Sequence, residues 1–165
     1  MSDLRDLNAC IPGAMNFKYG DFVRSDTAIR LNIPNIPTEN QWQSIEYVAT
    51  QILQPIRDEF GLIRVTSGFR SVPLCLAVGS NSKSWHSHGC AVDLDPCSSK
   101  VRLITILEFI HLHLSCHELI AEYFPYGWVH VASGKGIAPT KKIKLKDKDH
   151  NYSFETLDYI KDLYA

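Results

Sequence analysis

The stretch SGFRSVPLCLAVGSNSKSWHSHGCAVDLDP, residues 67–96, is the part of the chain around which the rest is organised, and GWVHVA, residues 127–132, complements it. The two stretches supply His86, Asp93 and His130, which are two imidazoles and one carboxylate. Such a ligand set is typical of a catalytic zinc site, in which three protein ligands leave one coordination position open. We therefore expect these three side chains to converge on a metal ion.

The local pattern around Asp93 supports this expectation. Residues 90–94 are predicted to form a strand, in which Asp93 lies on one face while Val92 and Leu94 point into a core. Gly89 permits a sharp turn between the loop of His86 and this strand. Spacing alone leaves open that these are ordinary surface side chains, and His88 is a rival ligand to His86.

Length and composition indicate one domain over residues 1–165. The 165 residues are 45% hydrophobic, enough for one buried core, and we expect a monomer. The formal net charge of −1 offers no excess of positive charge, so no nucleic-acid partner is expected. The most apolar region, residues 101–114, is interrupted by charged residues and histidines, which argues against a membrane span.

The composition of the N-terminal residues indicates the compartment in which the protein is synthesised. They contain Asp3 and Asp6 and lack the apolar run of a secretory signal, so we expect synthesis in the cytoplasm without a signal peptide. The five cysteines include no CxxC pair, which favours reduced and mostly buried thiols.

Periodicity predicts an α+β fold with a small antiparallel sheet flanked by helices. Residues 1–20 show little periodicity and are expected to form an irregular N-terminal arm. Helices are predicted over 21–31, 38–60 with a kink or break at Pro55, a short stretch after Ser71, 100–114, and from Ser153 onward. Strands are predicted over 62–66, 90–94, 118–124, 128–132 and 141–146, the third and fourth forming a hairpin.

Three motifs occur in a fixed order along the chain: SGFRS at 67–71, S-x-H-x-x-G-x-A-x-D at 84–93, and WVHV at 128–131. They resemble the zinc D-Ala-D-Ala carboxypeptidase and endopeptidase family, which includes phage endolysins and shares its fold with the hedgehog signalling domain. The similarity extends over roughly residues 20–132 and is strongest to the phage and prophage branch. It implies a hedgehog-like or DD-peptidase-like fold.

The resemblance also implies roles for individual residues. His86, Asp93 and His130 match the Zn²⁺ ligands, and Arg70 matches the arginine that binds a substrate carboxylate or carbonyl oxygen. A guanidinium suits that task because it offers a rigid fork of donors. Ser84 matches a small polar position beside the site. For Arg70 a structural salt bridge stays an alternative.

Trp128 precedes the His130 motif and is expected to line the substrate groove, as is Trp85 next to His86. Packing alone explains each tryptophan equally well.

The proton carrier is less clear from the sequence. Many relatives have an acidic residue three positions before the last histidine ligand, where this chain has Gly127. Glu122 is the preferred replacement as the general base, because the phage branch has a glutamate before a Trp-x-His strand. Asp95, on the strand of Asp93, is the second candidate, and an inactive site is the third possibility.

A second group of histidines, His111, His113 and His117, lies close to Cys116. His113 and His117 could share a metal only if one helix continued through both. We expect the helix to end near residue 114, so these histidines are interpreted as cations near a helix C-terminus.

The resemblance implies a zinc peptidase that hydrolyses a bond in the peptidoglycan stem peptide or cross-bridge, either as a carboxypeptidase or as an endolysin-type endopeptidase. Its expected place of action is the bacterial cell wall, for a phage-encoded or virion-associated protein. The alternative is a catalytically inactive zinc-binding module of a virion or the cell wall, motivated by Gly127.

Overall fold

The computed structural model describes residues 5–140 and 142–164, and its central feature is a six-stranded sheet. The strand order is β3-β4-β6-β5-β7-β8, and every neighbouring pair is antiparallel except β5 and β7, which are parallel. The strands are β3 (Ile63–Ser67), β4 (Ala91–Pro96), β5 (Glu118–Glu122), β6 (Trp128–Ala132), β7 (Ile143–Lys146) and β8 (Tyr152–Glu155). The predicted α+β class is confirmed.

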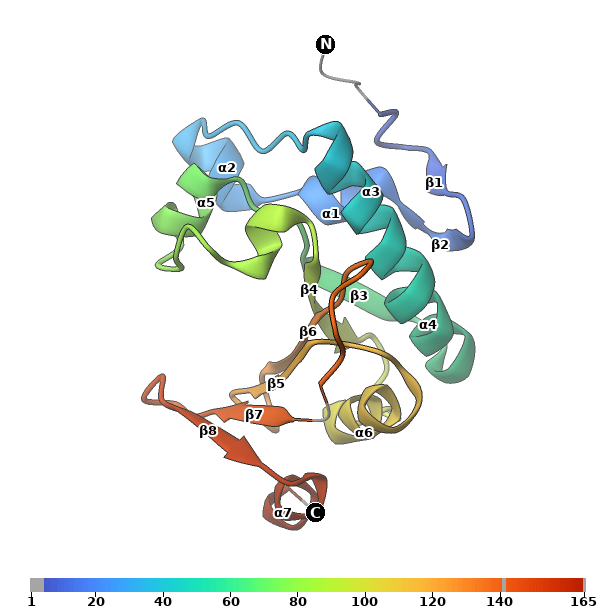
Figure 1. Ribbon diagram of the computed structural model, residues 1–165, viewed down its shortest axis with the longest axis vertical. Coiled ribbons are helices and arrows are strands. Elements are labelled where there is room, and N and C mark those ends of the chain that lie inside the picture. The colour runs from blue at the N-terminus through green and yellow to red at the C-terminus, as the bar shows by residue number, and fades with distance from the viewer. Residues whose placement is uncertain (1–4, 141, 165) are drawn as a thin grey trace.

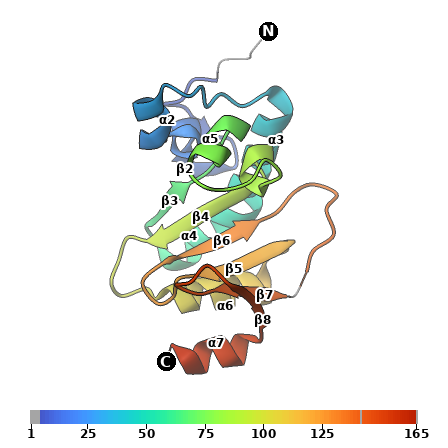
Figure 2. The same cartoon turned by 90° about the vertical axis from the view of Figure 1, so that its left-hand side faces the viewer.

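One face of this sheet is covered by helices (Figures 1 and 2). The covering helices are α3 (Glu39–Val48), α4 (Gln54–Phe60) and α6 (Leu103–His113). Val92 and Leu94 of β4 and Val129 and Val131 of β6 belong to the buried core, as the alternation of side chains in a strand requires. The residues between them therefore point to the open face.

The predicted helix over residues 38–60 is interrupted. A π-helical turn, Ala49–Leu53, joins α3 to α4, and Pro55 lies in the first turn of α4. Proline has no amide hydrogen to donate, which explains why the regular hydrogen-bond pattern is lost beside it. The capping box of Thr38 and Gln41 is present.

The expectation of an irregular arm over residues 1–20 is wrong for residues 10–18. These form a hairpin of β1 (Cys10–Ile11) and β2 (Ala14–Lys18), and its Ile11, Ala14 and Phe17 are buried in the core. The few apolar side chains are enough to anchor the hairpin because it packs on the helical segment 49–60. Residues 1–4 lie outside the described residues.

The next helices are shorter than predicted. The segment predicted as one helix over 21–31 is divided into α1 (Tyr19–Val23) and α2 (Asp26–Leu31), because Ser25 caps a new helix with its side chain. Two further short elements, α5 (Val72–Ala77) and the 3-10 helix η2 (Trp85–His88), follow β3.

The C-terminal part also differs from the prediction. Ser153 and Phe154, expected in a helix, lie in β8, and the helix α7 spans Leu157–Leu163. Pairing with β7 stabilises the extended conformation of these two residues. Buried side chains from Ile11 to Ile160 form one connected cluster, which supports our proposal of a single domain. Among the described residues, no helix has the length and apolar character that crossing a membrane requires.

Candidate metal centre

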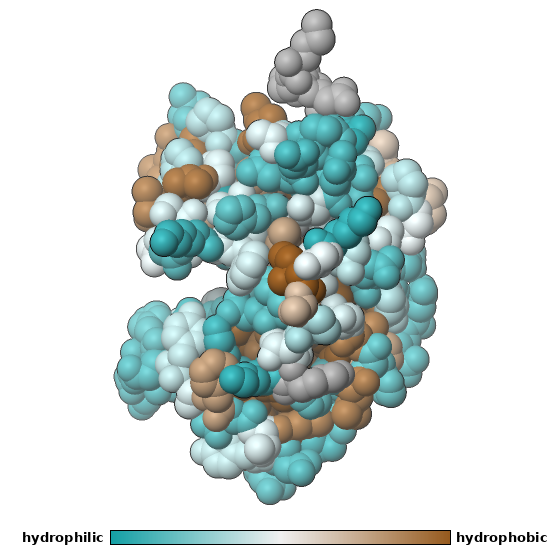
Figure 3. Space-filling model, in the orientation of Figure 1, coloured by the Kyte–Doolittle hydropathy of each residue, from teal (hydrophilic) through white to brown (hydrophobic). Residues whose placement is uncertain are grey.

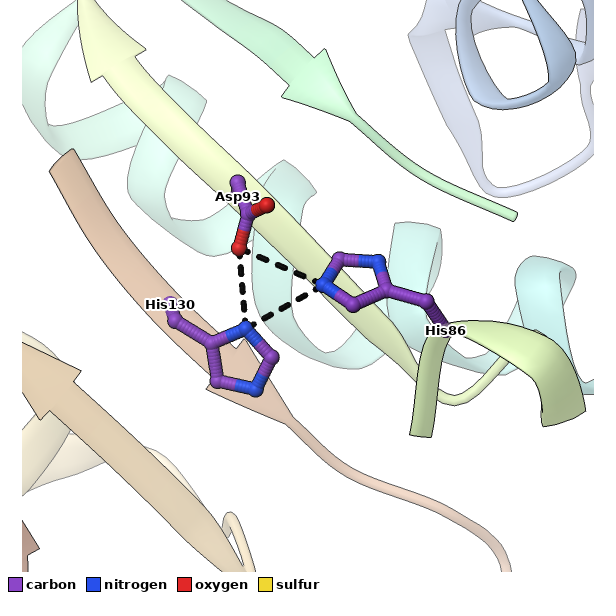
Figure 4. Close-up of side chains that lie close together, drawn as sticks. All are labelled: His86, Asp93 and His130. Carbon is purple, nitrogen blue, oxygen red and sulfur yellow. Dashed lines mark hydrogen bonds and ion pairs between the residues drawn. The ribbon is translucent and has the colours of Figure 1, made fainter. Parts of the chain in front are cut away.

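His86, Asp93 and His130 meet on the open face of the sheet (Figure 4). The Nε2 atom of His86 lies 3.2 Å from Nδ1 of His130 and 3.3 Å from Oδ1 of Asp93, and the last two atoms are 2.8 Å apart. All three residues are buried. Three potential ligand atoms therefore face one common point.

The sheet and one short turn place these side chains. Asp93 on β4 and His130 on β6 are direct register partners, so their side chains leave the same face at the same height. His86 comes from η2, which ends at Gly89 with φ of 72°. A Cβ at position 89 would lie 2.6 Å from the backbone oxygen of Gln41, so only glycine allows this close approach to α3.

Polar contacts from outside the cluster orient both rings, a hydrogen bond for His86 and an ion pair for His130. Nδ1 of His86 lies 2.7 Å from the carbonyl oxygen of Gly68, which can only accept, so this nitrogen carries the hydrogen and Nε2 offers a lone pair to the cluster. On His130 the arrangement is reversed: Nδ1 faces the cluster, and Nε2 lies 3.3 Å from Oε2 of Glu118. A carboxylate behind a histidine ligand is a common support in metal sites.

The residues fit a zinc ion. Atoms bonded at 2.0–2.1 Å to a tetrahedral ion lie roughly 3.3 Å apart, close to the two separations from Nε2 of His86, whereas Nδ1 of His130 and Oδ1 of Asp93 lie at a hydrogen-bond distance of 2.8 Å. Two nitrogens and a carboxylate oxygen are also ligands that zinc accepts, and they leave a fourth position free.

Burial and mutual contact shift the pKa values of the cluster in the absence of a metal. Burial lowers the pKa of His86. Burial raises the pKa of Asp93, but the two histidines lower it by more, so the carboxyl is ionised. For His130 burial lowers the pKa, yet hydrogen bonding to Asp93 and Glu118 outweighs it and raises the pKa to about 9.

Arg70 borders the cluster. Its Nη2 atom lies 3.6 Å from Oδ2 of Asp93, and its Nε is buried without a hydrogen-bond partner among the described residues. The guanidinium therefore has a loose ion pair with the ligand carboxylate and retains donors for another group.

A cavity of about 810 Å³ opens in front of the cluster, and its residues include Arg70, Ser84, Trp85 and Trp128. In Figure 3 the molecule is deeply notched on its left side, between the segments that carry η2 above and the β7–β8 pair below. The structure thus places all the residues that the sequence assigned to substrate binding at the wall of one cavity.

Glu122 also lines this cavity and points to the same face as His130, because β5 and β6 are in register with Ile120 opposite His130. The carboxylate is buried and accepts a hydrogen bond of 2.8 Å from Nζ of Lys146. Asp95, the second candidate for the base, is absent from the cavity wall and pairs with Arg64 at 3.0 Å.

The structure explains why residue 127 is a glycine. A Cβ at this position would overlap with the carbonyl oxygen of Glu122, so the β5–β6 connection admits no side chain there. An acidic residue three positions before His130 is therefore incompatible with this hairpin.

Glu118 is a site residue that the sequence analysis missed. It lies between His130 and Lys144, whose Nζ donates to its carboxylate, and its pKa is lowered to about 2: burial raises it, but His130 and Lys144 lower it by more. Strand alternation could have identified it, since Glu118 and Glu122 are four residues apart on one strand face.

The other histidines are separate from this centre. His88 is exposed, and the ring of His117 packs against Trp85 at a centroid distance of 4.1 Å. His113 packs against Phe109 within α6. Within residues 5–140 and 142–164, the cluster of His86, Asp93 and His130 is the group with metal-binding geometry.

Comparison with known proteins adds one match. The model of a family described as Peptidase M15 matches residues 15–132, which include both histidine motifs and the aspartate. No curated protein sequence matches the chain. Residues 133–164, with β7, β8 and α7, lie beyond the matched region.

Proposed function

The chain belongs to the peptidase M15 family, and on this premise we propose that it is a zinc-dependent peptidase of peptidoglycan, with His86, Asp93 and His130 as the metal ligands. The observation that carries the proposal is the convergence of these three buried side chains at 2.8–3.3 Å. A zinc ion held there supplies Lewis acidity and a water nucleophile that is active near neutral pH.

Glu122 is proposed as the proton carrier. It is the carboxylate on the cavity wall that is neither a proposed ligand nor in contact with a ligand ring. In this role Glu122 accepts a proton from the attacking water and returns it to the leaving amine. Lys146 holds the carboxylate in position.

Arg70, Ser84 and Trp128 are proposed to bind the substrate. Arg70 is suited to orient a carboxylate or a carbonyl oxygen of the peptide, because its guanidinium borders the cluster and retains free donors. Trp128 offers an apolar wall and packs against Tyr123 at a centroid distance of 5.2 Å. Ser84 lies on the opposite segment of the wall.

The proposed substrate is the stem peptide or cross-bridge of the bacterial wall, and the proposed setting is a phage-encoded or virion-associated protein. Both come from the likeness of the motifs to the phage branch. The competing proposal is a zinc-binding wall module without catalysis, motivated by Gly127 at the position where many relatives have the acidic residue.

The test is digestion of purified peptidoglycan, with the new peptide termini identified by mass spectrometry. We expect the zinc-loaded protein to release peptides and Glu122→Gln to lose at least about 100-fold in rate, while both retain one zinc per chain. Asp95→Asn serves as the matched control and is expected to retain activity, because Asp95 lies off the cavity wall. Zinc binding without any product from several wall types would favour the binding module.

A further inference from the structure

A second cavity, of about 720 Å³, lies beside the catalytic one and follows the edge strand β3. Every residue from Leu62 to Ser67 lines it. Arg70 and Val78 line both cavities, so the two adjoin at the arginine that borders the metal centre. A peptide bound in the catalytic cavity therefore has this second space on the far side of Arg70.

The strand that forms the floor of this groove has a free edge. β3 is the terminal strand of the sheet and pairs only with β4 among the described residues. The side of β3 away from β4 bonds to no other described strand, which leaves its outward N–H and C=O groups available. Extended peptides commonly bind to such an edge as an added strand.

The opposite wall of the groove is rich in arginine. Arg24 and Arg57 line it from α1's C-terminal end and from α4, and neither has an ion pair with any residue in the described part of the chain. Arg64, on β3 itself, also lines the groove and is paired with Asp95.

Two carboxylates, Asp21 and Asp26, are present in the same groove. Asp21 is already engaged as an acceptor from the backbone N–H of Lys18. Arg64 and Arg70, which also line the groove, already form ion pairs with Asp95 and Asp93, so Arg24 and Arg57 are the guanidinium groups left for a ligand. The groove therefore offers a carboxylate-bearing chain two arginines that are unpaired among the described residues.

We propose that this groove, which we call the β3 groove, binds an extended, carboxylate-bearing segment of the peptide substrate on one side of the scissile bond. The inference rests on the proposed peptidase function and deepens it. A carboxypeptidase needs room for only a short C-terminal piece of the peptide beyond the scissile bond, whereas the β3 groove offers space for a longer chain. The enzyme is accordingly an endopeptidase for acidic peptides, with Arg24 and Arg57 as specificity-determining residues.

The first test measures binding without catalysis. A fluorescein-labelled ten-residue peptide with internal glutamates, and its glutamine counterpart, are titrated into full-length zinc-loaded Glu122→Gln protein, and the anisotropy is followed. Mass spectrometry of the peptide after each titration confirms that it is intact. We expect the glutamate peptide to bind at least about tenfold more tightly.

Single variants locate the effect. Arg24→Gln and Arg57→Gln are each expected to weaken binding of the glutamate peptide about tenfold and to leave the glutamine peptide unchanged. Arg30→Gln is the control, because Arg30 is an exposed arginine of α2 outside the groove. Equal affinities of the two peptides, or equal effects of Arg30→Gln and Arg57→Gln, would overturn the proposal. Circular dichroism melts of each variant exclude unfolding as the cause.

A second measurement tests the added strand directly. Hydrogen exchange of the amides of residues 62–67 is expected to slow when the glutamate peptide is bound, and unchanged exchange there refutes pairing with β3. The two proposals fail in different ways. If the peptide binds but the wall is not hydrolysed, only the proposed peptidase function is contradicted. If the wall is hydrolysed but peptide binding does not depend on Arg24 and Arg57, only the proposed role of the β3 groove is contradicted.

Discussion

His130 is held between two carboxylates, Asp93 on the cluster side and Glu118 on the other. Because these contacts raise its pKa to about 9, the metal-free protein carries a proton on His130 at pH 7. His86, whose pKa is lowered by burial, is already neutral there. A bound metal and this proton compete for Nδ1 of His130.

Zinc affinity is therefore predicted to depend on pH with a defined sign. Between about pH 7 and pH 9 the metal must displace one proton, so the affinity should rise about tenfold per pH unit and level off above pH 9. Calorimetric titration in two buffers of different ionisation enthalpy counts the protons released. One proton per zinc is expected at pH 7.

The variant Glu118→Gln tests the contribution of the second carboxylate to this titration. Removal of that carboxylate lowers the pKa of His130, so fewer protons should be released at pH 7, and zinc affinity should fall by about 10-fold to 100-fold with the loss of ring orientation. Release of two protons, or of none, by the unaltered protein contradicts this account of the cluster.

Two lysines of β7 pair with two glutamates of β5. The parallel pairing of the two strands puts Lys146 beside Glu122 and Lys144 beside Ile120, from where Lys144 reaches Glu118. Burial lowers the pKa of Lys146, but hydrogen bonds to Glu122, Tyr123 and Tyr152 raise it by more, so the ammonium stays charged. A strand outside the family-matched region thus supports both carboxylates of the site.

Lys146→Met should reduce kcat by about 10-fold to 100-fold, because the buried Glu122 carboxylate loses its charged donor and its fixed position. The zinc content should stay at one per chain, since Lys146 is in contact with none of the proposed ligands. Steady-state kinetics with a soluble wall fragment measure the effect. Lys148→Met, in the exposed turn after β7, is the control, and an equal loss of rate in both variants argues against positioning by Lys146.

The cluster of His86, Asp93 and His130 connects parts of the chain that are far apart in sequence. It joins η2 to the central strands β4 and β6, and the hydrogen bond from His86 to Gly68 extends the connection to the segment after β3. Without a metal, protonated His130 is the charged partner that Asp93 and Glu118 share. The bound ion is therefore expected to stabilise the whole fold.

Removal of zinc with a chelator should lower the melting temperature. A ligand present at 100 times its Kd stabilises the native state by about 2.7 kcal/mol, which corresponds to about 5–10 °C for a chain of this size. Differential scanning calorimetry with and without chelator measures the shift. Asp93→Ala should melt at the same temperature in both conditions, and a chelator effect retained in that variant would place the stabilising metal elsewhere.

Much of the site could be predicted because its signals are local. The alternation of Asp93 with Val92 and Leu94 indicates which side chain leaves the core, and Gly89 marks the turn that brings His86 near. The hairpin of β5 and β6 follows from two strand-like segments with a Pro-Tyr-Gly connection. The N-terminal hairpin was missed because two short strands with three buried side chains leave little periodicity to detect.

The ordered motifs of the sequence were enough to identify the family and to predict the three-residue cluster that the fold brings together. They could not identify Glu118 as the support of His130, Lys146 as the partner of Glu122, or the β3 groove with Arg24 and Arg57. Local periodicity is carried by neighbouring residues and survives in the sequence alone. Pairing between β5 and β7, and the juxtaposition of α1 with α4 and β3, depend on contacts between segments more than 20 residues apart, and only the packing of the complete core brings them together.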